Sequence, residues 1–123
     1  MRQPSSTLTT QELEIMKIVW ERNRATVRDV YEALLERRKV AYTTVMTMMK
    51  ILEQKKYLKK NQSDRAYVYR PAQPQRQVIG AMVREFVNRV FNGSAEPLLV
   101  HLVEEHDLSP EGWEEIARLR RKS

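Results

Sequence analysis

The sequence predicts a mainly α-helical fold of 123 residues, in which three helices and one β-hairpin precede three further helices. Apolar residues recur at helical spacing in six separate segments. One aromatic and β-branched run, over residues 66–70, follows a polar stretch and predicts a strand. Hydrophobic residues make up 41% of the chain, which is enough for a packed core. No apolar run approaches the roughly 20 residues that span a bilayer, so we expect no membrane insertion.

The first two helices are marked by capping boxes, in which a threonine and an acidic residue three positions later satisfy each other's backbone amides. Thr9 and Glu12 form the first pair, and Thr26 and Asp29 form the second. The first helix should end near Asn23. The second should end at the basic run of residues 36–39.

The third helix should lie within residues 41–60, which read AYTTVMTMMKILEQKKYLKK. At about 100° per residue, one face is apolar and should pack on the core. That face consists of Val45, Met48, Met49 and Leu52. The opposite face carries Thr43, Thr47 and Lys50, whereas Thr44 and Met46 lie nearer the flanks. Threonine is a mediocre helix former, so this face favours a contact role over an ordinary solvated surface.

A β-hairpin should follow, with strands over residues 57–60 and 66–70 and a polar turn over residues 61–65. It carries four of the basic residues, Lys59, Lys60, Arg65 and Arg70. Residues 1–72 hold 15 Lys and Arg against 8 Asp and Glu, whereas residues 73–123 hold 7 against 8. A basic region of this kind, in a chain of net charge +6, favours binding to a polyanion.

Three helices followed by a basic hairpin form the winged helix-turn-helix arrangement, which we assign to a DNA-binding domain at residues 8–72. The major groove admits one helix with short outward side chains that form hydrogen bonds. Thr43, Thr47 and Lys50 meet this demand. Lys59 and Arg65 would contact phosphates from the hairpin. For Lys55, Lys56, Lys59 and Lys60 we favour general electrostatic attraction, with a solvated surface as the alternative.

Residues 73–123 should form a helical dimerisation domain after a hinge at residues 71–74. Helices are expected over residues 75–91, from an N-cap at Ser94 to about Glu105, and from Ser109-Pro110 onward. The apolar stripe is broader than one helix can bury, so a twofold-related second copy would cover it. The alternative is that the chain's own last two helices cover it. The predicted dimerisation residues are Val78, Ile79, Met82, Val83, Phe86, Val87, Val90, Phe91, Leu98 and Leu102.

The sequence gives little support for catalysis. The absence of Cys excludes disulfides, thiolate–metal sites and cysteine nucleophiles. His101 and His106 are five residues apart, which is not the spacing of a shared helix face, so we expect no metal site. We therefore expect a cytoplasmic protein that is not an enzyme and needs no cofactor. The alternative to sequence-specific DNA binding is a winged-helix module that docks another protein as an adaptor subunit.

Four stretches resemble the penicillinase-repressor family, the BlaI/MecI/CopY group. They read LTTQELEIMKIVWERNRATVRDVYEAL, AYTTVMTMMKILEQKKYL, RAYVYRP and FNGSAEPLLVHLVEEHDLSPEGWEEI, and together they span about residues 8–119. The resemblance implies a homodimeric transcriptional repressor that occupies a palindromic operator. It also implies that the third helix contacts DNA, at positions that correspond here to Tyr42, Thr43, Thr44, Met46 and Thr47.

Two features depart from the family pattern. Antibiotic-sensing members are cut at an Asn-Phe bond in the second C-terminal helix, and His101-Leu102 stand at that place here. Copper-responsive members carry Cys motifs in the tail, and this chain has no Cys. We therefore do not expect that cleavage at this place releases the protein from its operator. Release through copper-binding thiolates is excluded. The sequence does not identify an upstream sensor or protease.

Overall fold

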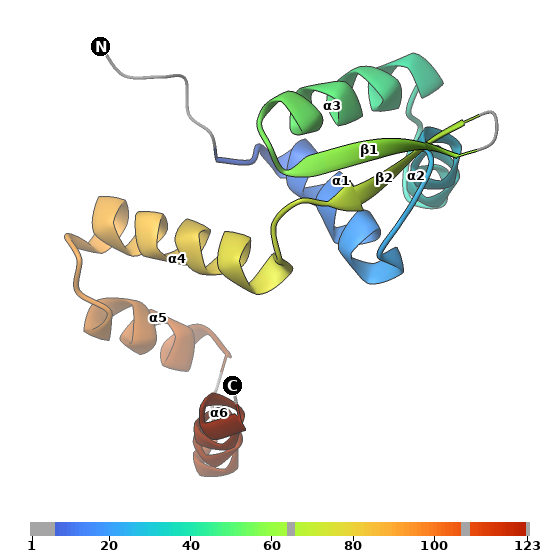
Figure 1. Cartoon of the computed structure of the whole chain (residues 1–123). Helices are drawn as coiled ribbons and strands as arrows, with labels where there is room; N and C mark the ends of the chain where they lie inside the picture. Colours follow the sequence, from blue (N-terminus) through green and yellow to red (C-terminus); the bar gives the residue numbers. More distant parts are fainter. Residues whose placement is uncertain (1–6, 64–65, 107–108, 123) are drawn as a thin grey trace. The chain divides into compact units, whose positions relative to one another are not determined.

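The computed structural model describes residues 7–63, 66–106 and 109–122. Its elements follow the predicted order of three helices, a hairpin and three helices (Figure 1). They are α1 (Thr10–Arg22), α2 (Val27–Leu35), α3 (Tyr42–Gln54), β1 (Leu58–Ser63), β2 (Ala66–Pro71), α4 (Gln75–Phe91), α5 (Glu96–His106) and α6 (Pro110–Lys122). The predicted fold class is confirmed. The chain divides into two compact units, Met1–Gly80 and Ala81–Ser123.

Both predicted capping boxes are present. The Glu12 amide donates to Thr9 Oγ1 at 3.1 Å, and the Thr9 amide donates to Glu12 Oε1 at 2.9 Å. The corresponding bonds between Thr26 and Asp29 are both 3.0 Å long. Helix α1 ends at Asn23, which takes the left-handed conformation with φ of 71°. These local bonds fix where the first two helices begin, because they satisfy amides that the helix itself leaves free.

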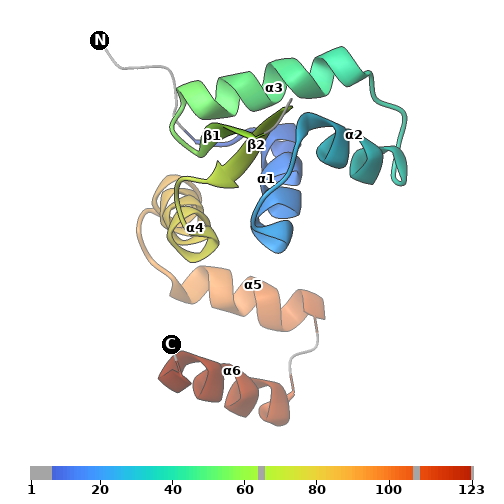
Figure 2. The same ribbon diagram turned by 45° about the vertical axis from the view of Figure 1, so that its right-hand side comes forward.

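The buried face of α3 fastens this helix to the rest of the first unit. Val45, Met49 and Leu52 are fully buried, as predicted, and Met48 is half-buried. Figure 2 shows α3 alongside the hairpin, with α1 and α2 next to them. The core of the first unit consists of Leu8, Ile15, Met16, Ile18, Val19, Ala25, Val30, Leu34, Val45, Met49, Leu52, Tyr57, Leu58, Val68, Tyr69 and Val78. Close packing on one side holds the outer face of α3 in a fixed orientation.

The hairpin is longer than predicted. Strand β1 continues to Ser63, and its antiparallel register pairs Leu58 with Pro71 at one end and Ser63 with Ala66 at the other. The expected turn over residues 61–65 is therefore wrong for residues 61–63, because polar residues extend the ladder where its surface faces solvent. Ala25, which lies between α1 and α2, forms an isolated antiparallel β-bridge with Tyr69 of β2.

Residues 72–78 are tied to the first unit. The Ala72 amide donates to Tyr57 O at 2.8 Å, and the Trp20 indole donates to Gln73 O at 3.0 Å. The Gln73 side chain donates to a backbone carbonyl at 2.9 Å. Val78 is only 3% exposed within the single chain, so its side chain is already covered. Val78 therefore differs from the other predicted dimerisation residues, because the first unit already buries its side chain.

An ion pair that the sequence analysis missed joins the start of α1 to the end of α3. Lys55 Nζ lies 2.9 Å from Glu12 Oε1, and the Glu12 side chain is almost completely buried. Burial raises the pKa of the Glu12 carboxyl, but the Thr9 amide and the Lys55 ammonium together outweigh it, and the net pKa is lowered. The general electrostatic role expected for Lys55 is corrected, because this ammonium is held by Glu12.

Glu12→Gln should lower the free energy of unfolding by about 1–3 kcal/mol at pH 7, because Gln keeps the capping box but loses the ion pair. A carboxyl with a lowered folded pKa stabilises the fold above its ordinary value of 4.5, and this contribution is lost as the pH falls through the folded pKa. The difference between the two proteins should therefore shrink below pH 4.5. Urea unfolding at a series of pH values measures it.

The control for this experiment is Glu21→Gln, which makes the same chemical change on the exposed surface of α1. It should change the free energy of unfolding by less than about 0.5 kcal/mol at any pH. A pH-independent difference for Glu12→Gln would contradict the ion-pair account.

The second unit contains most of α4 together with α5 and α6. Ser109 caps α6 as predicted, since its hydroxyl accepts from the Gly112 amide at 3.1 Å. The predicted cap at Ser94 is wrong by one residue. The first carbonyl bonded in α5 is that of Ala95, and the Ser94 hydroxyl donates instead to the Glu96 carboxylate at 2.9 Å.

Candidate nucleic-acid interface

The outward face of α3 is exposed along its whole length. Thr43, Thr44, Thr47 and Lys50 are all exposed, including Thr44, which the helical-wheel calculation placed nearer the flank. Met46 is 40% exposed and extends this face with an apolar side chain. The face therefore combines hydroxyls, a methionine and one cation, which suits contact with base edges and phosphates.

Tyr42 anchors the first turn of this face to α2. Its ring meets the Tyr31 ring edge to face, with centroids 5.3 Å apart. The Arg28 guanidinium lies 5.8 Å from the Tyr42 centroid, within cation–π distance. Arg28 also makes an exposed ion pair with Glu32 at 3.6 Å. Tyr42 is thus partly used to position the helix and Arg28, although the sequence analysis treated it only as a DNA contact.

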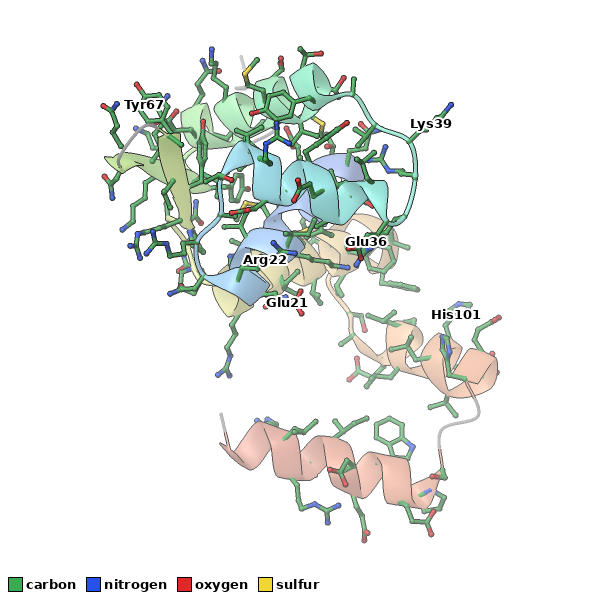
Figure 3. All side chains as sticks on the ribbon, turned by 90° about the vertical axis from the view of Figure 1, so that its right-hand side faces the viewer. Glu21, Arg22, Glu36, Lys39, Tyr67 and His101 are labelled. Carbon is green, nitrogen blue, oxygen red and sulfur yellow. The ribbon has the colours of Figure 1, made fainter. Side chains whose placement is uncertain are left out.

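The hairpin presents two different faces. Lys60 lies on the same side as α3: its ammonium sits 4.4 Å from the Tyr67 ring centroid and 3.6 Å from Glu53 Oε1. Tyr67 is 50% exposed and projects from the edge of the hairpin (Figure 3). Lys59 and its cross-strand neighbour Arg70 line a different hollow.

The hairpin residues that the sequence predicts as DNA contacts are Lys59 and Arg65, and their positions differ from the prediction or are not described. Lys59 shares its hollow with Trp20 and Asn23, so it is not brought together with the exposed face of α3. Arg65 lies outside the described residues. Adjacent residues of a strand point to opposite faces, which explains why only Lys60 joins the α3 side.

A hollow of about 690 Å³ lies between the start of α2, the exposed face of α3 and the hairpin. Among the described residues, its lining contains three cations, Arg28, Lys50 and Lys60, and no carboxylate. Its apolar lining includes Val27, Tyr42, Met46, Tyr67 and Tyr69. Arg28 and Tyr67 were not predicted from the sequence as contact residues, and Lys60 was expected to have only a general electrostatic role. The sequence signal that could have separated Lys60 from Lys59 was the two-residue period of the strand.

The second candidate surface is apolar and belongs to the second unit. None of the described side chains of α5 and α6 is fully buried in the single chain. The predicted residues Val83, Phe86, Val90 and Leu102 are exposed, whereas Met82, Val87, Phe91 and Leu98 are half-buried. Ile79 is also half-buried but belongs to the first unit. Further large apolar residues are exposed on the same unit: Leu99, Val100, Trp113, Ile116 and Leu119. Exposed apolar residues in such number are typical of interaction surfaces.

No described helix combines the length and the apolar character that crossing a membrane requires. Within the same described parts of the chain, no cluster of three or more His, Cys, Asp or Glu residues has the arrangement of a metal site.

The first unit is thus a winged helix-turn-helix with an exposed polar face on its third helix, which defines a class of DNA-binding proteins. The penicillinase repressor family model matches residues 8–122, and the chain belongs to this family. Its members are transcriptional regulators and not enzymes.

Individual relatives support this assignment. The transcriptional regulator BlaI of Mycobacterium tuberculosis is 39% identical over 95 residues, which cover 76% of this chain and 69% of that protein. The penicillinase repressor of Bacillus licheniformis is 26% identical over 112 residues, covering 91% and 88% of the two chains. A solved structure of B. licheniformis BlaI, in its monomeric form in complex with the blaP half-operator, matches with a TM-score of 0.50 and 26% identity. It covers 60% of this chain and 88% of the solved one.

Proposed function

We propose that this chain is a homodimeric transcriptional repressor that binds a palindromic operator in the cytoplasm and blocks transcription by occupying it. One observation carries the proposal: the chain matches the penicillinase repressor family over residues 8–122, through both the winged helix and the helices that follow. The solved relative bound to a half-operator supports DNA as the partner of the winged helix.

In this proposal, residues 8–72 bind DNA and residues 73–123 dimerise. Helix α3 enters the major groove and presents Thr43, Thr44 and Thr47 to base edges, with Met46 against a thymine methyl or a sugar. Lys50 contacts a phosphate or a guanine edge. A twofold dimer sets its two recognition helices about 34 Å apart, or a multiple of this distance, and this spacing requires a palindromic site.

The direct test is a gel shift at low salt. It uses DNA fragments from the region upstream of the protein's own gene and from the rest of the genome. Repression predicts that a small set of fragments is retarded and that footprinting reveals a palindrome. Binding should weaken steeply as salt rises, because phosphate contacts release counterions. If no fragment is retarded, a protein-docking adaptor becomes the better account.

Thr47→Ala should relax the sequence preference at one operator position by about 1–3 kcal/mol, because Thr47 is exposed in the middle of the α3 face. Competition between the operator and its single-base variants measures this loss. A matched control is Thr10→Ala, which removes a threonine from the exposed start of α1. Equal weakening on all sequences would show that Thr47 does not read a base.

A further inference from the structure

We propose that the hollow between α2, α3 and the hairpin seats the sugar–phosphate backbone of one DNA strand, with Arg28 and Lys60 as phosphate contacts and Tyr67 against the sugar. This inference rests on the proposed DNA-binding function and adds three residues to it. The first unit would hold the backbone of one DNA strand between α3 and the hairpin.

The position of the hollow supports this assignment. A helix in the major groove and a hairpin at the adjacent minor groove are separated by one strand, since each strand's backbone forms the wall between two grooves. The hollow lies between these two elements and is lined by residues of both. The start of α2 closes its third side with Thr26, Val27 and Arg28.

The chemistry of the lining also suits a backbone strand. A sugar–phosphate chain alternates an apolar ribose face with an anionic phosphate. The hollow has an apolar lining that includes Val27, Met46 and Tyr67, and it carries three cations. An exposed protein surface with this combination gains both apolar contact and counterion release when the strand is seated.

Two of the cations are held in place before DNA arrives. Arg28 lies over the Tyr42 ring at 5.8 Å and also faces the exposed Glu32 at 3.6 Å. Lys60 lies over the Tyr67 ring at 4.4 Å and also faces Glu53 at 3.6 Å. Held cations lose less conformational freedom on binding a phosphate than free ones do.

The hairpin supplies a matched control. Lys59 and Lys60 are neighbours with the same charge, but Lys59 lines the hollow with Trp20 and Asn23 on the other face. A general electrostatic field would treat both lysines alike. A seated strand distinguishes them.

The experiment compares Arg28→Gln, Lys60→Gln and Lys59→Gln with the wild-type protein. The probe is a duplex that the wild-type protein itself selects from random-sequence DNA. Operator affinity is measured across a salt series. Arg28→Gln and Lys60→Gln should each make the negative slope of log K against log salt shallower by about 0.9, the value of one lost phosphate contact, whereas Lys59→Gln should change this slope much less.

Ethylation interference on the same duplex gives the position of each contact. In each half-site, ethylation of one phosphate should weaken binding of the wild-type protein but should cause no further loss of affinity in Arg28→Gln. Ethylation of a nearby phosphate on the same strand should behave in the same way for Lys60→Gln. Equal slope changes for all three variants would overturn the inference, as would unchanged slopes for Arg28→Gln and Lys60→Gln. Failure of the wild-type protein to select any duplex would instead overturn the proposed function.

Discussion

Val90→Asp should convert the protein from a dimer into a monomer at micromolar concentration and lower its operator affinity by about 10²- to 10⁴-fold. Val90 is 45% exposed in the single chain, so an aspartate there meets solvent as long as the chain is alone. In a dimer that covers α4, the same carboxylate would be buried without a partner, which is costly. Loss of the second subunit removes the gain that two linked half-site contacts provide.

Sedimentation velocity and gel shift on an intact operator measure the two effects. A duplex with a single half-site supplies a further check, because Val90→Asp and the wild-type protein should bind it with similar affinity. Unfolding of the first unit followed by near-ultraviolet circular dichroism shows whether the winged helix stays intact in the variant.

Asn88→Asp is the matched control. It places the same charge two residues away, at an exposed polar position, and about 160° of helix rotation separates it from Val90. Both positions lie in the last turns of α4, so the effect of the helix dipole is similar. Asn88→Asp should remain dimeric. If Val90→Asp also remained dimeric and bound the operator as the wild-type protein does, the proposed dimerisation surface would be wrong.

Features fixed by neighbours in the sequence could be predicted, because their physics is local. The capping boxes at Thr9 and Thr26 join residues three positions apart, and the structure has both. The buried face of α3 follows from its apolar period, and Val45 and Met49 are buried as expected. The predicted N-cap of α5 was wrong, because the Ser94 hydroxyl donates a hydrogen bond to the Glu96 carboxylate instead.

Features that join distant segments could not be read in this way. Glu12 and Lys55 are 43 positions apart, so neither the ion pair nor the loss of Lys55 as a free cation was visible in the sequence. Arg28 reaches the exposed face of α3 only because α2 packs beside that helix. The two-residue period of a strand puts Lys59 and Lys60 on opposite faces, but only the packing of the hairpin shows which of the two faces meets α3. The proposed interface of the second unit would depend on a second copy, and the single chain shows only which apolar side chains it leaves uncovered.

The division of α3 into a core face and a reading face can be tested with two methionines of the same helix. Met49 has no exposed surface, whereas Met46 is 40% exposed. Met49→Ala should lower the free energy of unfolding by about 2–5 kcal/mol, because it leaves a cavity in the core of the first unit. Met46→Ala should change that free energy by less than about 0.5 kcal/mol, since its side chain lies at the surface.

Operator binding should show the opposite order once folding is accounted for. At low temperature, where both variants are folded, Met46→Ala should weaken operator binding by about 1 kcal/mol through lost apolar contact with the DNA. Met49→Ala should bind nearly as well as the wild-type protein, because it leaves the exposed face unchanged. Urea unfolding and gel shift on the same preparations measure both quantities. If Met46→Ala proved the more destabilising variant, or if Met49→Ala alone lost operator affinity while folded, the orientation of α3 on which the proposed DNA contact depends would be wrong.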